Sequence, residues 1–409
     1  MPCKSCNKKV NKILIDLGSA PLSNNLLNKV DESEKWYPLK VMICDKCWLA
    51  QVSHNLSSSE VFNKDYPYFS SVSKSLLLNS KKYVEEVSNK FLKNKKNNKV
   101  LEVASNDGYL LQYFKNKKFV SKIIGIEPTP EAAKISRKKK IKTLEVFFEK
   151  EEAKKIDKKF GKFDLIIANN VVAHIPNINS FIEGIKKLLS KNGIATIEFQ
   201  YLVDLIKKNI FDNIYHEHYY YYSFTSFNKI LERFNLKAFN YDKIEAQGGS
   251  LRIYITHKNN KKQKVSPKIN KIKNTEIKIG IKKLKFYKNL FTDAISKKNQ
   301  FLLKLIELKK RKKTIFGYGA AAKGNTMINF CGIKNDLIDY VVDKNLYKQG
   351  KFLPGSRIPI VSESFIKKKK PEYIVIIPWN IAEEIKKDLN YVKGWGCKFI
   401  VYQPQVKII

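Results

Sequence analysis

Arginine, histidine and cysteine are scarce in this 409-residue chain, and it has no long apolar run. Only five of its 78 basic residues are arginine, whereas proteins that read bases and phosphates favour the planar guanidinium group. No stretch approaches the ~18 apolar residues of a membrane-spanning helix, and the polar start from Met1 to Lys8 is unlike a signal peptide. These absences favour a cytoplasmic protein that binds neither nucleic acid nor membrane.

What the chain has instead is lysine, and its formal net charge is +40. The lysines form scattered runs, such as 138–140 and 367–370, and no segment interleaves aromatic residues with a concentrated basic patch as a nucleic-acid surface would. We therefore interpret the charge as a compositional bias spread over solvated faces. A zinc-ribbon nucleic-acid-binding protein is the alternative from another functional class, and a steep salt dependence of duplex binding would identify it.

Four of the six cysteines form two Cys-x-x-Cys pairs near the N-terminus. In a reducing compartment this spacing favours zinc over disulfides, because each pair supplies half of a tetrahedral site. Four thiolates leave no open coordination position, so the metal would be structural and could not activate water. The expected ligands of this zinc, in a module over residues 1–58, are Cys3, Cys6, Cys44 and Cys47.

The rest of the chain alternates short apolar strands with helical patterns, which predicts an α/β fold. We expect a Rossmann-like domain with a parallel, doubly wound sheet over residues 59–260. A lysine-rich linker at 257–267 and a long helix then lead to a second Rossmann-like α/β domain, over residues 261–409. The strands expected in the first of these domains are 100–104, 123–126, 163–168 and 193–199.

Three expected strand ends carry residues suited to a ligand, because the carboxyl ends of parallel strands face the ligand crevice. The first is followed by a turn of small residues that lets a ligand approach the backbone, and the second ends in Glu127, a carboxylate that can accept two ribose hydroxyls. The residues expected to bind the cofactor are Ala104, Ser105, Asn106, Asp107, Gly108, Glu127 and Asn169.

The densest chemical cluster is Tyr215-His216-Glu217-His218, because histidine is the side chain best suited to proton abstraction near neutral pH. In an extended segment Tyr215 and Glu217 share one side and the two histidines the other, whereas a bend would let both sides meet a substrate. A His-x-His metal site and a structural aromatic patch are the alternatives. His174, close to Asn170 at the third strand end, is either a pocket residue or a packed core histidine.

These blocks together resemble the sugar C-methyltransferases, which make branched deoxysugars. The resemblance runs in order over essentially the whole chain. It rests on the cysteine pairs, residues 104–108, His174-Ile175-Pro176, the cluster at 215–218, Gln247 to Arg252, and Gly317 to Thr326. Ala104 departs from the family, which usually has glycine there, so this turn must accommodate a methyl group.

The resemblance implies transfer of a methyl group from S-adenosylmethionine (SAM) to a carbon, expected to be C3, of a nucleotide-diphosphate 4-keto sugar. The neighbouring carbonyl makes the C–H acidic. His218 would remove the proton beside Tyr215 and Glu217, and kcat would rise with pH through a group near the ordinary histidine pKa. Asn170 and His174 would hydrogen-bond the keto and hydroxyl oxygens. The implied substrate-binding residues are Tyr68, Gly249, Arg252, Lys323 and Asn325.

An O- or N-methyltransferase acting on a sugar or small acceptor is the closest alternative, since such a reaction needs no adjacent carbonyl. The choice of base among His218, Glu217 and Tyr215 stays open, as do the nucleotide, the deoxysugar and the product stereochemistry. A monomer is the expected state.

Overall fold

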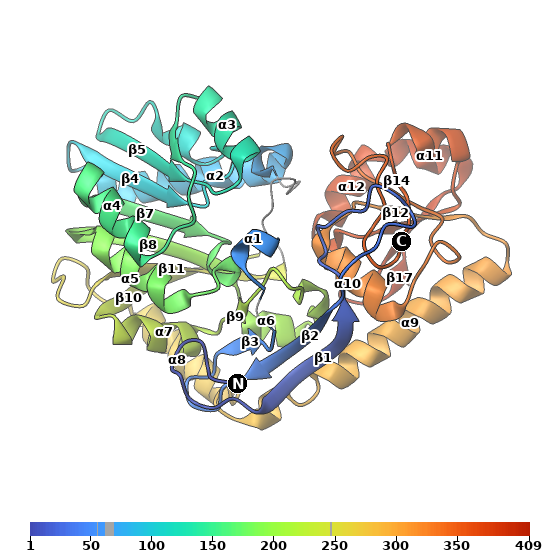
Figure 1. The fold of residues 1–409 in the computed structure, drawn as a ribbon, viewed down its shortest axis with the longest axis horizontal. Coiled ribbons are helices and arrows are strands. Elements are labelled where there is room, and N and C mark those ends of the chain that lie inside the picture. Colours follow the sequence, from blue (N-terminus) through green and yellow to red (C-terminus); the bar gives the residue numbers. More distant parts are fainter. Residues whose placement is uncertain (55, 62–68, 246–247) are drawn as a thin grey trace.

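The computed structural model describes residues 1–54, 56–61, 69–245 and 248–409. Three β-sheets organise this part of the chain (Figure 1). A small sheet at the N-terminus lies below and between two larger α/β units, and a long helix runs along the C-terminal one. This arrangement has the cysteine-bearing module and the two Rossmann-like units that the sequence predicts.

The N-terminal sheet is antiparallel and takes one strand from far along the chain. Its fourth strand pairs Gln51 with Tyr220 and Ala50 with Tyr221, so the segment directly after His218 becomes part of the cysteine-bearing module. The strands, in sheet order, are β1 (Lys12–Ala20), β2 (Tyr37–Ile43), β3 (Ala50–Val52) and β9 (Tyr220–Tyr221).

The central sheet has the order β10-β11-β8-β7-β4-β5-β6. The five strands from β8 to β6 are parallel, as predicted, but β11 and β10 extend the sheet as antiparallel strands that the sequence analysis did not include. The strands are β4 (Asn98–Val103), β5 (Val120–Ile126), β6 (Lys142–Leu144), β7 (Phe163–Asn169), β8 (Leu189–Gln200), β10 (Leu236–Ile244) and β11 (Ser250–His257).

Helices flank this sheet, and some of them begin at side chains that accept hydrogen bonds from the free backbone N–H groups of the first turn. The caps are Ser73, Asn177 and Ser223, the last in a reciprocal capping box with Ser226. The helices of this part are α1 (Ser58–Val61), α2 (Lys74–Val87), α3 (Pro130–Lys138), α4 (Lys150–Phe160), α5 (Ile178–Leu188), α6 (Leu202–Lys207) and α7 (Phe224–Arg233).

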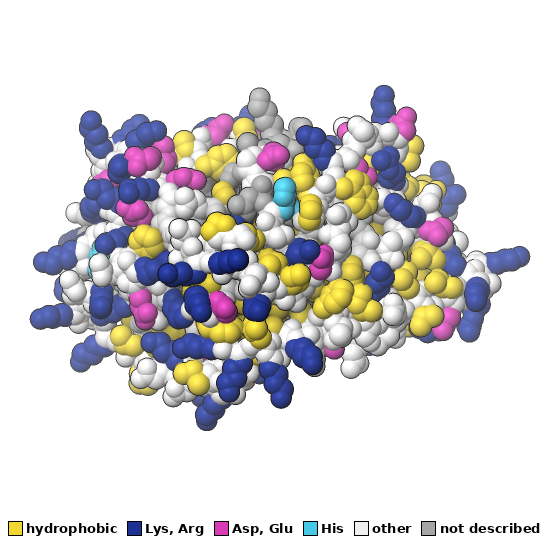
Figure 2. Space-filling model, turned by 60° about the horizontal axis from the view of Figure 1, so that its bottom comes forward, with side chains coloured by type: hydrophobic (Ala, Val, Ile, Leu, Met, Phe, Trp, Pro, Cys, Tyr) yellow, Lys and Arg dark blue, Asp and Glu magenta, His cyan; other side chains and the backbone are white. Residues whose placement is uncertain are grey.

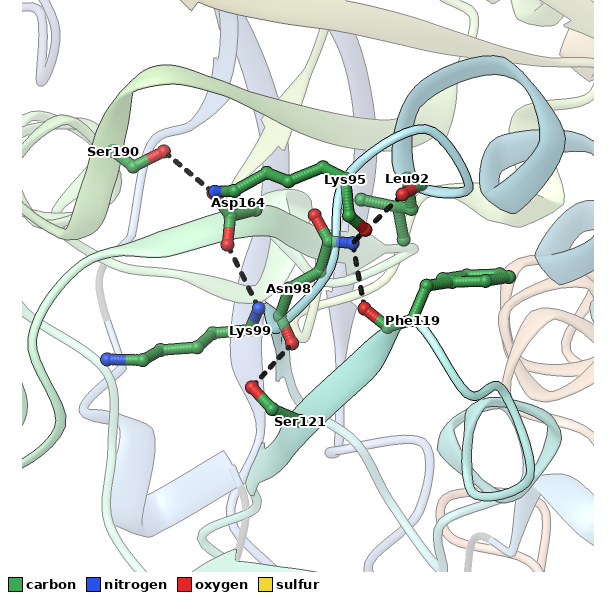
Figure 3. Close-up of polar contacts among 8 residues, drawn as sticks. All are labelled: Leu92, Lys95, Asn98, Lys99, Phe119, Ser121, Asp164 and Ser190. Carbon is green, nitrogen blue, oxygen red and sulfur yellow. Dashed lines mark hydrogen bonds and ion pairs between the residues drawn. The ribbon is translucent and has the colours of Figure 1, made fainter.

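Polar side chains fasten the amino-terminal edge of the central sheet (Figure 3). The Asn98 amide nitrogen lies 2.6–2.9 Å from the carbonyl oxygens of Leu92, Lys95 and Phe119. Asp164 accepts a bond from the Lys99 backbone at 3.0 Å and pairs with the Lys95 ammonium group. The opposite, carboxyl edge is the one at which parallel α/β sheets bind ligands.

The stretch expected as a linker returns instead to the central domain. The Ser266 backbone bonds to Phe239 at 2.8 Å, and the helix that follows packs against β10 and α7. The crossing to the C-terminal domain is made by a 21-residue helix that starts at Leu290, later than its predicted first apolar residue, Phe286. These helices are α8 (Pro267–Lys278) and α9 (Leu290–Lys310).

The C-terminal sheet has the order β14-β13-β12-β15-β16-β17, parallel except for the last pair. Its strands are β12 (Ile315–Tyr318), β13 (Tyr340–Val342), β14 (Ile360–Val361), β15 (Tyr373–Ile376), β16 (Lys398–Val401) and β17 (Lys407–Ile408). Its helices are α10 (Ala322–Cys331), α11 (Ser364–Lys369) and α12 (Ala382–Asp388).

Short helical turns complete the described structure. They are η1 (Ser70–Val72), η2 (Ser88–Leu92), η3 (Leu111–Phe114), η4 (Val172–His174), η5 (Phe211–Asn213), η7 (Leu284–Tyr287), η8 (Trp379–Ile381) and η9 (Asn390–Trp395).

Basic side chains are spread over the molecular face drawn in Figure 2, with acidic ones between them. Such a distribution agrees with the interpretation of the charge as a compositional bias. Within the described ranges, no helix combines the length and the apolar character needed to cross a bilayer.

Candidate active site

A cavity of about 970 Å³ lies at the carboxyl edge of the central sheet. Ala104, Glu127, Asn170 and Gln200 line it, each at or just after the end of one parallel strand. The C-terminal domain and the N-terminal segment supply further lining residues, among them Asn24, Lys323, Trp379 and Gln403.

The turn after β4 brings backbone to the cavity through left-handed conformations. Ala104 has φ +57° and Asn106 φ +48°, and both line the cavity. Gly108 has φ +75°, and a Cβ there would come within 2.7 Å of Ile141 and 2.8 Å of Ser136. The turn thus accommodates the alanine methyl group by a conformation that costs roughly 1–2 kcal/mol for an L-residue, while the glycine is required by packing.

Glu127 is buried beside this turn, with 4% of its surface exposed. Its Oε2 accepts the Asn106 N–H at 2.9 Å, and its Oε1 accepts the backbone N–H of Thr129 at 2.9 Å and the Thr129 hydroxyl. Burial raises the pKa of this carboxyl group. A carboxylate has about four lone-pair sites, so one stays open to a ligand hydroxyl. Binding two ribose hydroxyls, as expected from the sequence, would require Thr129 to give up a bond.

The same turn is tied to η1, the short helix in front of α2. Asn106 accepts the Ser70 N–H at 2.8 Å, and Asp107 accepts the Ser71 N–H at 3.2 Å. The Asp107 carboxylate also lies 3.7 Å from the Lys139 ammonium group. Asp107 is 1% exposed, and these contacts hold the turn against η1.

The Tyr215–His218 cluster forms a tight turn, closed by a 2.9 Å bond from the His218 N–H to the Tyr215 carbonyl. Because of this bend, Tyr215, Glu217 and His218 all line the cavity. His216 turns away, and its Nε2 lies 3.1 Å from the Tyr37 carbonyl in the N-terminal module. Among the described residues, the four cysteines are the one group of His, Cys, Asp or Glu arranged to hold a metal, so this cluster forms no metal site.

Two histidines, His174 and His218, lie close together at this turn and have the same tautomer. Nδ1 of His218 lies 2.9 Å from the Asn213 carbonyl, and Nδ1 of His174 lies 2.9 Å from the Glu217 carbonyl. A carbonyl only accepts, so each Nδ1 carries the proton, and in a neutral ring the lone pair is then on Nε2. The centroids of the two imidazole rings are 4.7 Å apart, and the centroid of the Tyr215 ring is 4.1 Å from that of His218.

Burial keeps both imidazoles neutral. It lowers the pKa of His174 to about 4, and it lowers the pKa of His218 well below the ordinary value, with His174 and Lys323 adding to the effect. The expected rise of kcat near the ordinary histidine pKa therefore moves to more acidic pH.

Asn170 is held at the end of β7 by Glu198 of β8. It has φ +53°, its N–H donates to the Glu198 carbonyl at 2.8 Å, and its amide nitrogen is 3.4 Å from the Glu198 carboxylate. Arg252 donates to the same carboxylate through Nη2 at 2.7 Å and Nε at 3.1 Å, and its guanidinium group lies over the Tyr83 ring. Arg252 does not line the described cavity. Its contacts act on Asn170 indirectly, because they hold the Glu198 side chain to which Asn170 also bonds.

The other implied substrate residues are placed differently. Lys323 lines the cavity, donates to Asn380 at 2.9 Å and lies over the Trp379 ring. Gly249 and Asn325 do not line the described cavity. A Cβ on Gly249 would lie 2.3 Å from the Asp204 carboxylate. Tyr68 lies outside the described residues.

The four N-terminal cysteines converge in the small module. Their Sγ atoms all lie within 4.8 Å of one another, with Cys3 and Cys47 at 3.5 Å and Cys6 and Cys44 at 3.7 Å. Tetrahedral zinc with bonds of about 2.3 Å places its sulfurs about 3.8 Å apart. Cys44 is fully buried, and the donor set fits a closed structural zinc site.

Comparison with known families covers most of the chain in three consecutive parts. Residues 3–62 match a zinc binding domain, residues 78–240 a methyltransferase domain, and residues 245–404 the C-methyltransferase C-terminal domain. These matches indicate a SAM-dependent C-methyltransferase. C-methyltransferase NovU of Streptomyces niveus is 29% identical to it over 410 residues, which are 100% of this chain and 96% of that protein.

Solved methyltransferase structures resemble a part of this C-methyltransferase. Magnesium protoporphyrin IX methyltransferase from Synechocystis PCC 6803, with bound SAM, has a TM-score of 0.34 and 11% identity, covering 44% of this chain and 79% of its own. The plantazolicin methyltransferase BpumL, in complex with SAH, has a TM-score of 0.34 and 14% identity, covering 44% and 83%.

This C-methyltransferase uses SAM and carries structural zinc. The domain matches favour an enzyme over the alternative of a zinc-ribbon nucleic-acid-binding protein. The turn after β4 and the acid after β5 fit the donor, because a left-handed turn exposes backbone to a ligand and Glu127 keeps an acceptor site.

Several cavity residues of this C-methyltransferase escaped the sequence analysis. Gln200 ends β8, and both polar atoms of its side chain lack a hydrogen-bond partner among the described residues, as does Nδ2 of Asn213. The sequence could have indicated Gln200 as a cavity residue, because it stands at the carboxyl end of a predicted parallel strand. Asn24 and Trp379 had no local signal, because contacts distant in sequence place them.

Proposed function

We propose that this C-methyltransferase methylates C3 of a nucleotide-diphosphate 4-keto deoxy sugar through an enolate. The observation that carries the proposal is the pair of neutral imidazoles, His218 and His174, at the cavity beside Asn170. An unactivated sugar C–H is not acidic enough for an imidazole base. A ketone on the adjacent carbon is therefore what such a base requires.

His218 is proposed as the base, since its Nε2 carries the lone pair and Nδ1–H is held by the Asn213 carbonyl. Nε2 takes the C3 proton, the C–H electron pair forms the enolate, and the resulting imidazolium keeps both protons until solvent removes one. SAM, held by the turn after β4 and by Glu127, would supply a methyl group on a positively charged sulfur, and the broken C–S bond would leave a neutral thioether. The carbon nucleophile forms the new C–C bond, and the ketone re-forms.

The two neighbouring side chains have different proposed roles because of their hydrogen-bonding capacity. The Asn170 amide nitrogen can donate to the keto oxygen, where negative charge develops. His174 has its lone pair on Nε2, so in this tautomer it accepts from a substrate hydroxyl and cannot donate to the ketone. The side chains of Gln200 and Asn213 offer further sites for the sugar hydroxyls.

The diphosphate is assigned to the C-terminal side of the cavity. Lys323 stands in the first turn of α10, where the N-terminal backbone and the helix dipole favour an anion. Lys348 also lines the cavity, donates to the Ala320 carbonyl at 2.7 Å and lies 3.8 Å from Asp343. A diphosphate there would place the sugar toward the Tyr215–His218 turn.

The test is a panel of 4-keto nucleotide sugars, assayed for methyl transfer, with carbon NMR of the product. In parallel, each sugar is incubated with enzyme in heavy water without SAM. We expect a new methyl group on C3 and deuterium at C3 without the donor. A methyl group on oxygen or nitrogen would establish the O- or N-methyltransferase alternative. Absence of both exchange and turnover across the panel would refute the substrate class.

A further inference from the structure

The segment between β1 and β2 leaves the N-terminal module and binds the C-terminal domain (Figure 1). Leu27 exchanges two backbone hydrogen bonds with Phe352, at 3.0 and 2.8 Å. Arg357 donates to the Glu32 carbonyl at 3.0 Å, and the Gly355 N–H donates to Glu34 at 2.8 Å. The segment is therefore fixed at several points on that domain.

Asn24 is the residue of this segment that reaches the catalytic turn. Its Nδ2 donates to Oε1 of Glu217 at 2.6 Å, across 193 positions of sequence, and its side chain lines the cavity. Glu217 is 3% exposed. A donor to a buried carboxylate contributes more than a neutral hydrogen bond does, so removal of the Asn24 amide weakens the hold on Glu217.

Glu217 connects this contact to both histidines. Its carbonyl receives the Nδ1–H of His174, and His218 follows it directly in the chain. A shift of Glu217 would therefore disturb the hydrogen bond that fixes the tautomer of His174. It would also turn the ring of His218.

We infer that Asn24 is a positioning residue: it holds Glu217, and through Glu217 the two imidazoles, so that the N-terminal segment completes the active site. The inference rests on the proposed function for its kinetic consequence. It also makes the geometry of the catalytic turn depend on the docking of residues 21–36 on the C-terminal domain.

The first experiment compares Asn24→Ala with Asn25→Ala. Asn25 is the exposed neighbour, and its N–H bonds to the Leu22 carbonyl through the backbone alone. For Asn24→Ala we expect kcat to fall about 10- to 100-fold, the usual loss for misplaced catalytic groups, with little change in KM. Asn25→Ala keeps the wild-type rate. Equal rates for both variants and wild type would overturn the inference.

Asn24→Asp separates positioning from a merely structural role. Two carboxylates in contact repel each other when both are ionised, so one pKa of the pair rises and the second ionisation occurs only at higher pH. At low pH the protonated Asp side chain can donate to Glu217 as the amide does, and at high pH the pair repels. The kcat of the variant relative to wild type should fall as pH rises, whereas a structural defect would give a ratio independent of pH.

A substrate-free measurement keeps this inference distinct from the proposed function. The chain has five histidines, so the imidazole nitrogen signals can be assigned by NMR with the help of His218→Asn. Asn24→Ala should shift the signals of His174 and His218, and Asn25→Ala should not. Unmoved signals refute the role of Asn24 whatever the substrate, whereas moved signals with no turnover on the sugar panel refute only the proposed substrate.

Discussion

At the scale of single residues, the protonation of His218 depends on one backbone carbonyl and on burial. The Asn213 carbonyl selects the tautomer with the lone pair on Nε2, and burial disfavours the imidazolium form. The first effect orients the proposed base, and the second keeps its neutral form available at neutral pH. A strongly lowered pKa also makes the base weaker, so the enolate needs direct stabilisation by donors such as Asn170.

His218→Asn should therefore retain binding of both ligands and lose turnover by about 10²–10⁴-fold, the range for a positioned acid–base group. It should also abolish deuterium exchange at C3, because exchange requires deprotonation but no methyl transfer. Glu217→Gln and Tyr215→Phe are the matched controls within the same turn. If His218→Asn keeps full exchange and Glu217→Gln loses it, the base is Glu217.

The pH dependence of kcat should show the lowered pKa of His218. Only the neutral ring accepts a proton, and with a lowered pKa the neutral form is complete at pH 7. The rate should be level through neutrality and fall only on acidification below the lowered pKa. An ordinary histidine would instead give half the maximal rate at about pH 6.5. A midpoint at that value in the wild type would contradict the burial argument.

At the scale of elements, the proposed donor site consists of strand ends and the turns that follow them. β4 and β5 are adjacent and parallel, so the turn at 104–108 and Glu127 meet at one edge. The sequence predicted both strands, because short apolar runs bounded by polar turns are a local signal. The extra strands β10 and β11 were missed, since nothing local reveals that a hairpin joins a parallel sheet.

Glu127→Ala should weaken SAM binding about 10- to 100-fold, as expected for loss of charge-assisted bonds worth roughly 1.5–3 kcal/mol, and leave nucleotide-sugar affinity unchanged. Part of the loss arises because Glu127 also holds the Asn106 N–H in the turn. The control is Glu131→Ala, an exposed carboxylate at the start of α3. Calorimetry showing wild-type donor affinity for Glu127→Ala would remove this residue from the site.

At the scale of the whole molecule, the cysteine-bearing module is joined to the segment that follows His218. β9 begins two residues after His218 and pairs with β3 of the module. His216 and Asn24 add contacts between the two parts. The folding of the cysteine-bearing module is therefore coupled to the position of the residues that line the cavity at 215–221.

The protein should contain about one zinc per chain, and Cys44→Ser should lose it. We expect lower thermal stability and, because β9 loses its partner, reduced turnover at the same time. Cys397→Ser, a buried cysteine of the C-terminal domain, is the control that should keep its zinc. Metal analysis that finds no zinc in a folded wild type with free thiols would refute the site.

The sequence by itself determined the features that depend on near neighbours in the chain. These are the two Cys-x-x-Cys pairs, the strand-turn units with Ala104 and Glu127, and the titratable cluster at 215–218. Spacing is enough there, because a turn or strand end sets the geometry within a few residues.

Only the tertiary structure decided which side chains of the cluster face the cavity, the tautomers and lowered pKa values of His174 and His218, and the placing of Arg252 behind Asn170. The contact between Asn24 and Glu217 likewise has no counterpart in local sequence. The physical reason is that burial and hydrogen-bond partners depend on segments up to hundreds of residues apart, which meet only when the three sheets have packed.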